Sequence, residues 1–174
     1  MRVCALAVLG LLSAAAARAQ QSAPRAHTWW ASLGGGFGQM EEAGDFGGHV
    51  AVSFQSGARV LSIRVAAVTS LLENLFGPSG HPDEVADFGI LYGRGTPRGR
   101  VGASAGIGVG LAEVMILGPG SIRRGTWYFT VPLEAQVAWR PLTFLGVGAY
   151  GFASFNGGAS FGGLTFMVQA GRLR

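Results

Sequence analysis

The chain reads TWYFTVPLEAQVAWR from Thr126 to Arg140, with apolar and polar side chains in alternation. Every odd position is apolar, from Trp127 at one end to Trp139 at the other. The even positions include Tyr128, Thr130, Glu134, Gln136 and Arg140. A period of two residues indicates a β-strand, because successive strand side chains point to opposite faces. We predict a strand with one apolar and one polar face, which bulges or kinks at Pro132, where a ladder hydrogen bond is lost.

The same alternation recurs in seven other segments of the chain. Their apolar rows run over residues 29–37, 46–54, 61–67, 86–92, 101–111, 145–155 and 164–170. Predicted connections near 39–45, 71–84, 117–125 and 156–159 fall at one end, and those near 55–58, 93–99 and 140–143 at the other. Longer loops at one end and short turns at the other are typical of membrane barrels. The sequence therefore predicts an all-β fold, an eight-stranded antiparallel up-and-down transmembrane β-barrel.

The second face of the strands separates a membrane barrel from a soluble, lipocalin-like ligand-binding barrel, whose outer face would meet water. In two segments this face carries no charge. It reads Gly102, Ser104, Gly106, Gly108 and Gly110 in one and Phe144, Gly146, Gly148, Tyr150 and Phe152 in the other. Small side chains suit the narrow interior of an eight-stranded barrel. We therefore place the apolar rows outside; the alternative, a soluble barrel, predicts a protein in the soluble fraction.

Aromatic residues cluster toward both ends of the apolar rows. The residues toward the loop end are Phe37, Phe46, Trp127 and Phe155, and those toward the turn end are Trp29, Phe54, Tyr92 and Trp139. Twelve residues separate Trp127 from Trp139. This is about 40 Å along a strand and about 30 Å along the membrane normal after tilting, which suits an apolar band of about 25 Å with its interfaces. These residues are predicted to form two aromatic girdles.

Charged and polar side chains on the inward face form a candidate site. They are Arg64, Asp87, Glu134, Gln136 and Arg140, with His49 on the same face. Buried charges without partners are very costly, so these groups are predicted to pair across the lumen. A narrow ion path is one reading of such a network. A permanently closed polar core is favoured, because eight strands enclose only enough room for side chains.

The composition and the first residues predict export. The chain has 174 residues, 13% of them charged, and 30 glycines, whereas globular domains average about 25% charged residues and about 7% glycine. Residues 1–19 resemble a cleaved secretory signal, with Arg2, an apolar run over 3–12 and Ala17 and Ala19 before the cleavage point. Residues 20–174 then form one barrel domain. The arginines are scattered, which argues against nucleic-acid binding.

Enzymatic chemistry has little support in the sequence. A rim-active lipid-modifying barrel enzyme would need a paired nucleophile and base, and His27, His49 and His81 have no serine and acid at a suitable spacing. Residues 146–151 match G-x-G-x-x-G, yet a strand end follows them where a nucleotide site needs a helix. We predict no enzyme, metal or cofactor. The apolar loop over 71–78 is predicted to pack onto the barrel mouth.

The layout resembles that of the small eight-stranded outer-membrane barrels of Gram-negative bacteria, the OmpA/OmpX-like group. The segments DFGILYG at 87–93 and FGGLTF at 161–166 look like segments of its uncharacterised members. This resemblance implies a monomer in the bacterial outer membrane with a structural or surface-interaction role. Its expected partners are outer-membrane lipid, lipopolysaccharide and the outer-membrane assembly machinery. One departure is the C-terminal GRLR, since the group usually ends on an aromatic residue that this machinery reads.

Overall fold

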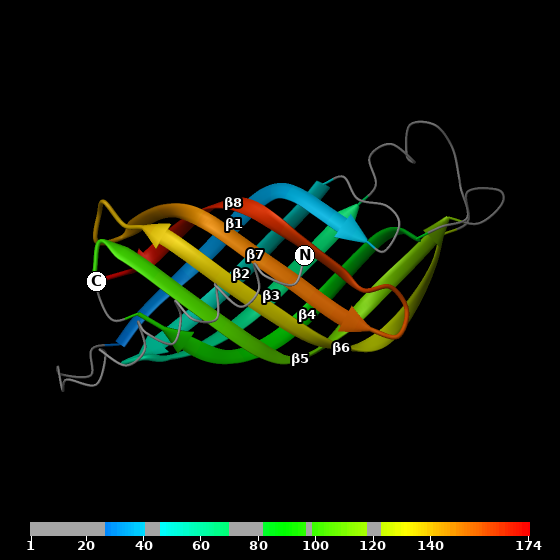
Figure 1. Cartoon of the computed structure of the whole chain (residues 1–174), viewed down its shortest axis with the longest axis horizontal. Helices are drawn as coiled ribbons and strands as arrows, with labels where there is room; N and C mark the ends of the chain where they lie inside the picture. The colour runs from blue at the N-terminus through cyan, green and yellow to red at the C-terminus, as the bar shows by residue number, and fades with distance from the viewer. Residues whose placement is uncertain (1–26, 41–45, 70–81, 97–98, 118–122) are drawn as a thin grey trace, which may run out of the picture.

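Eight strands close into one antiparallel barrel, with β8 paired to β1 (Figure 1). The computed structural model describes residues 27–40, 46–69, 82–96, 99–117 and 123–174. The strands are β1 (His27–Met40), β2 (Phe46–Ser56), β3 (Arg59–Thr69), β4 (Pro82–Gly95), β5 (Val101–Leu117), β6 (Arg123–Trp139), β7 (Leu145–Asn156) and β8 (Phe161–Arg172). The predicted fold class is confirmed. Among these residues no helix is long and apolar enough to cross a membrane.

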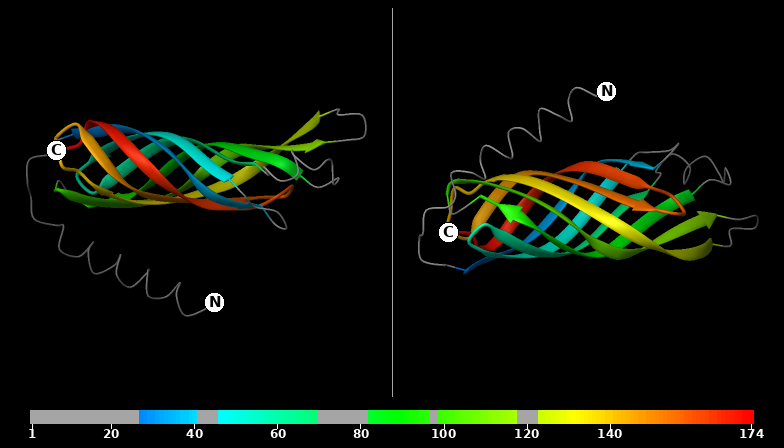
Figure 2. Two further views of the ribbon diagram at one scale, coloured as in Figure 1. Left: turned by 90° about the horizontal axis from the view of Figure 1, so that it is seen from above. Right: turned by 60° about the horizontal axis from the view of Figure 1, so that its bottom comes forward.

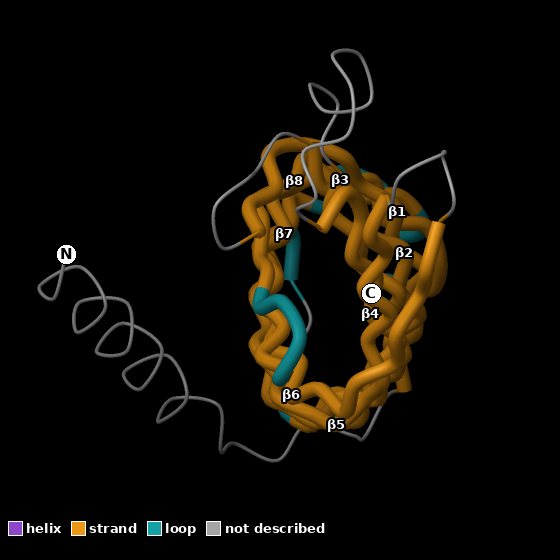
Figure 3. The backbone as a smooth tube through the Cα atoms, turned by 90° about the vertical axis from the view of Figure 1, so that its right-hand side faces the viewer, coloured by secondary structure: helices purple, strands orange, loops and turns teal. Residues whose placement is uncertain are grey.

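The pairing register determines the tilt of the strands. Starting at Trp29, the pairs lead through Phe54, Leu61, Tyr92, Ile107, Leu133, Ala153 and Gly162 and return to β1 at Gln39. One circuit therefore ends ten residues from its start. In an eight-stranded barrel such a stagger tilts the strands by about 40° from the axis. Figure 3 looks along this axis and shows the closed wall.

Burial alternates along each strand in the sense opposite to that of a soluble protein. Phe166 is 84% exposed and Leu33 64%, whereas Arg64 and Gln169 are completely buried. The apolar rows that the sequence predicts to face outward do so on all eight strands. An outer surface of this kind suits hydrocarbon, and closure leaves no unpaired strand edge.

Two connections show why their residues form tight turns. Between β2 and β3, Gly57 adopts a φ of 62°, a conformation that favours glycine. Between β7 and β8, the Asn156 side chain accepts hydrogen bonds from the Gly158 and Ala159 amides at 2.9 and 2.8 Å. Its amide group also donates to the Ala159 carbonyl at 2.9 Å, so one asparagine holds the whole turn.

Some strand ends differ from the prediction. β5 and β6 have 17 residues each and extend past the other strands at the loop end (Figure 2). Their connection is therefore shorter than the predicted 117–125. Phe144, which the alternation places inside the barrel, is exposed. It lies in the connection before β7, where the backbone is no longer extended and the period of two does not apply.

Pro132 interrupts pairing without shifting the register. The pairs Ile107–Leu133 and Gly110–Thr130 flank a gap in the β5–β6 ladder and keep one register, so the predicted bulge is absent. The proline ring points into the lumen, where a Cβ on Gly89 would come within 2.8 Å of it. It can reach this far because Gly89 on β4 has no side chain. The missing side chain makes room for the ring, and the β5–β6 register is kept.

Two glycines on the inner face of β5 should respond differently to alanine. A Cβ at Gly108 would collide with the backbone carbonyl of Ile90, whereas at Gly106 its nearest neighbours lie at 3.5 Å or more. We expect Gly108→Ala to lower the free energy of unfolding by about 1–3 kcal/mol. Gly106→Ala, the matched control, should change it by less than about 0.5 kcal/mol. Urea titrations in phospholipid vesicles measure the free energy of unfolding of both variants. Equal losses would contradict a steric role of the close backbone contact at Gly108.

Candidate functional site

All five residues of the predicted lumen network lie on the inner face and are buried. Arg64 comes from β3, Asp87 from β4, Glu134 and Gln136 from β6, and Arg140 directly follows β6. Each sits at an inward position of the two-residue alternation, which is why the strands bring them together. Their direct contacts form three arrangements, one around Arg64 and Asp87, one around Glu134 and one around Gln136, and Arg140 lies apart beside Trp30.

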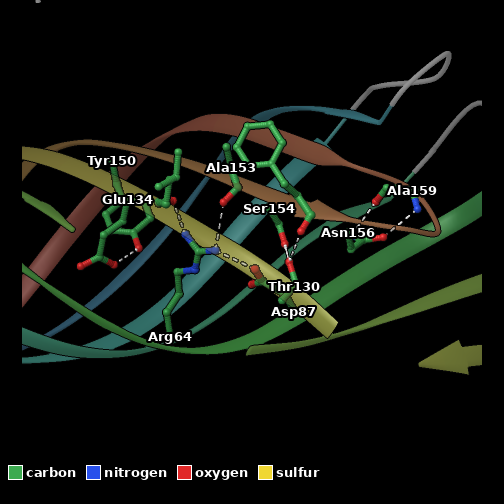
Figure 4. A network of polar contacts seen from close by, with 11 residues as sticks. Arg64, Asp87, Thr130, Glu134, Tyr150, Ala153, Ser154, Asn156 and Ala159 are labelled. Carbon is green, nitrogen blue, oxygen red and sulfur yellow. Dashed lines mark hydrogen bonds and ion pairs between the residues drawn. The ribbon is translucent and has the colours of Figure 1, made fainter. Parts of the chain in front are cut away.

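The Arg64 guanidinium crosses the lumen and holds the only ion pair that joins two inward side chains in the described part of the chain (Figure 4). One nitrogen lies 2.7 Å from the Asp87 carboxylate, and both side chains are fully buried. Arg64 also donates to the carbonyls of Leu133 at 2.6 Å and Ala153 at 3.4 Å. One side chain therefore ties β3 to β4, β6 and β7 through the middle of the barrel.

Glu134 is paired with a tyrosine. The Tyr150 hydroxyl donates to its carboxylate at 2.6 Å. The Tyr150 ring stacks on His49, with centroids 3.7 Å apart and planes at 11°. The His49 Nδ1 lies 2.9 Å from the Thr165 hydroxyl, which continues the chain of contacts to β8. Tyr150 and Thr165 were not among the predicted network residues, although both occupy inward positions.

The third arrangement lies nearer the turn end. Gln136 donates to the Ser104 hydroxyl at 2.8 Å and accepts from the Gln169 amide at 2.7 Å. These contacts join β5, β6 and β8. Neutral amides and hydroxyls fill this layer of the lumen, and it carries no net charge.

Arg140 corrects the expectation that every inward charge pairs with an opposite one. Its guanidinium lies over the Trp30 ring, 5.3 Å from the centroid. The two lumen carboxylates, Asp87 and Glu134, belong to deeper layers than this turn-end position. The absence of a side chain at Gly102 leaves the room that the guanidinium occupies. The favourable partner is therefore an aromatic face.

Apolar side chains occupy both ends of the lumen. At the turn end Trp30 packs with Val60 and Leu173, all nearly or completely buried. The cluster toward the loop end includes Met40, Val68, Val85, Val114, Phe152 and Phe161. That cluster also includes Ala138, Tyr150 and Met167, so it extends from the loop end to the level of the polar contacts. Trp30 is not among the predicted site residues, although the row that starts at Trp29 implies its inward position.

All eight predicted girdle residues point outward and are about half exposed. At the turn end Trp29 pairs with Phe54, which pairs with Leu61, which pairs with Tyr92. Trp29 and Phe37 are eight residues apart on β1, about 20 Å along the axis at this tilt. The Trp127–Trp139 spacing on β6 is longer, so the loop-end aromatic residues do not lie at one height along the barrel axis.

The enzyme alternative gains no support from the histidines. His27 is exposed at the start of β1, and His49 is buried in the lumen. His81 and the apolar loop 71–78 lie outside the described residues. Within the described residues, no three histidine, cysteine or acidic side chains gather as metal ligands would.

Tyr150→Phe tests the second arrangement. The variant removes the donor from the buried Glu134 carboxylate, so we expect the free energy of unfolding to fall by about 1.5–3 kcal/mol. Tyr92→Phe is the matched control, because the Tyr92 side chain is exposed on the outer surface. It should change stability by less than about 0.5 kcal/mol. Urea unfolding in vesicles provides the readout, and an unchanged midpoint for Tyr150→Phe would refute a stabilising role of this contact.

Comparison with known proteins finds similar folds but no matching sequence family. No family model matches the chain, and no curated protein matches it. The structure resembles that of Neisserial surface protein A, with a TM-score of 0.57 at 8% identity, over 83% of this chain and 95% of that one. It also resembles the N-terminal β-barrel domain of Pseudomonas aeruginosa OprF, with a TM-score of 0.53 at 10% identity, over 83% and 98% of the two chains.

A third similar structure is Ail, the attachment invasion locus protein of Yersinia pestis. Its TM-score is 0.52 at 11% identity, and the likeness covers 83% of this chain and 95% of Ail. Ail has also been solved in complex with the heparin analogue sucrose octasulfate, and that structure has a TM-score of 0.51 at 10% identity. At such identities the likeness concerns the fold. The chain has the fold of small bacterial outer-membrane β-barrels, as its sequence predicts.

Proposed function

We propose that the protein is an integral outer-membrane barrel with a structural or surface-interaction role and a closed lumen. The observation that carries this proposal is the inversion of the barrel: apolar side chains cover its exterior, and an ion pair with polar contacts fills its interior. Only a lipid environment makes such an exterior favourable. Residues 1–19 serve as the export signal, residues 20–174 form the mature monomer, and the outer-membrane assembly machinery inserts it.

The closed lumen is supported by the order of its layers. An ion path would need continuous polar walls, but Trp30, Val60 and Leu173 fill the turn end and a larger apolar cluster lies toward the loop end. Between them Arg64 is engaged by one carboxylate and two carbonyls. These contacts make the interior a core that holds the wall together, and we assign it no transport role.

A surface-interaction role is supported by the extended β5–β6 hairpin, which projects past the other strands at the loop end. This end carries charges of both signs, from Glu84 and Glu113 and from Arg123 and Arg124 at the start of β6. The proposed contact is a surface partner or lipopolysaccharide.

The first experiment compares the migration of unboiled and boiled protein from washed membranes on SDS gels. A folded membrane barrel resists SDS until it is heated, so two bands of different mobility are expected. The mature N-terminus should be Gln20. Planar bilayers that contain the folded protein should show no discrete conductance steps. Recovery in the soluble fraction without a mobility shift would refute membrane insertion, and regular conductance steps would refute the closed lumen.

A further inference from the structure

Two neighbouring rows of outward side chains at the turn end differ sharply in chemistry. The first row, formed by Trp29, Phe54, Leu61 and Tyr92, is apolar and mostly aromatic. The second, formed by His27, Ser56, Arg59 and Arg94, lies one outward position nearer the turns and is polar and cationic. Parts of both rows line a surface groove of about 390 Å³. The outer surface thus changes from apolar to cationic along the groove.

The cationic row contains an unusual pair. Arg59 and Arg94 stand directly opposite each other on β3 and β4, and both are exposed. Like charges at directly opposed positions destabilise a sheet. The described side-chain carboxylates belong to other parts of the barrel: Asp87 and Glu134 face the lumen, and Glu84 and Glu113 belong to the loop end. An anion from outside the chain would relieve this repulsion.

We propose that this groove binds the headgroup of an anionic phospholipid from the leaflet at the turn end. The inference rests on the proposed membrane insertion. Arg59, which lines the groove, and Arg94, which stands opposite it on β4 beside the lining, bind the phosphate diester, since guanidinium groups match phosphate oxygens in geometry and charge. Trp29, Phe54 and Tyr92 contact the glycerol region and the first methylenes, as aromatic side chains do at membrane interfaces.

The charge of the groove selects among phospholipids. A zwitterionic headgroup would bring an ammonium or choline cation toward the two guanidinium groups and lose much of the attraction. A phosphatidylglycerol headgroup has a net negative charge and hydroxyl groups that can hydrogen-bond to Ser56 or His27, both of which line the groove. The chemistry therefore fits an anionic lipid.

The test is a lipid titration of folded protein in non-ionic detergent, followed by native mass spectrometry. Protein whose heat-dependent gel shift has been verified is titrated with dioleoyl phosphatidylglycerol or dioleoyl phosphatidylcholine. We expect a preferred single phosphatidylglycerol adduct. The double variant Arg59→Gln/Arg94→Gln should weaken this adduct by about tenfold.

Matched variants separate a site from a general effect of charge. Arg123→Gln/Arg124→Gln removes the same charge at the start of β6, at the loop end, and Arg100→Gln removes one exposed arginine at the turn end. Both should change the adduct by less than about twofold. Equal losses in the two double variants, equal binding of the two lipids, or displacement by low millimolar inorganic phosphate would each overturn the proposal. A missing gel shift would instead refute the proposed function.

Discussion

Asp87→Asn is expected to lower the free energy of unfolding of the barrel by about 3–5 kcal/mol. The amide keeps the shape of the carboxylate but leaves the Arg64 guanidinium without its counter-charge in a fully buried position. The carbonyls of Leu133 and Ala153 still accept hydrogen bonds, yet they cannot neutralise the charge. Urea titration in phospholipid vesicles, read as the fraction that migrates as folded protein on unboiled gels, measures the loss.

Two further variants show whether the cost comes from the unpaired charge. Glu113→Gln neutralises an acid on the outer face at the loop end and should change stability by less than about 0.5 kcal/mol. Arg64→Met/Asp87→Leu removes both charges, and we expect it to recover most of the stability that Asp87→Asn loses. A double variant as unstable as the single one would show that packing, and not the lone charge, determines the effect.

Ile90→Arg places a charge on the outer face near the middle of β4, between Ile63 and Val109 of the neighbouring strands. In a lipid bilayer we expect it to lower the free energy of unfolding by about 2–4 kcal/mol, because an arginine at the midplane loses its hydration. The measurement is the same urea titration in vesicles. If the outer face of this barrel were in contact with water and not lipid, Ile90→Arg would be nearly neutral.

The control for Ile90→Arg lies at the turn end of the same surface. Val101 is also exposed, at 62% against 48% for Ile90, and it pairs with Trp139, a predicted girdle residue. Val101→Arg can reach the interface, so we expect a loss of only about 0–1 kcal/mol. The difference between the two arginine variants reports depth in the bilayer. Equal losses of unfolding free energy in the two variants would contradict a membrane-spanning outer surface bounded by two aromatic girdles.

The architecture could be predicted because one signal repeats in every strand. Barrel strands separate lipid from lumen residue by residue, so the alternation at Thr126–Arg140 determines both faces at once. The positions of Arg64 and Glu134 follow from it directly. Periodicity also places Trp30 and Tyr150 inside, and their importance could have been found by reading the inward rows for large side chains as well as for charges.

The partners inside the lumen could not be predicted in the same way. The period of two specifies the face of a residue but not its height along the axis, which depends on the stagger of ten residues around the barrel. The β6–β7 register brings Tyr150 to Glu134, and the stagger leaves Arg140 beside Trp30. The lengths of β5 and β6 were also underestimated, because pairing between them continues through residues with no clear alternation.

Glycines opposite large inward side chains limit the substitutions that this barrel wall can accept during evolution. Pro132 fits because Gly89 lacks a side chain, and the Arg140 guanidinium occupies the room that Gly102 leaves. A large side chain on one strand thus requires a glycine on the strand that faces it. A lineage that enlarges such a glycine must shrink its counterpart, so substitutions should accumulate as exchanges between distant positions. Glycine at these positions fits the volume of a facing side chain, and it makes the barrel wall more constrained, not more pliable.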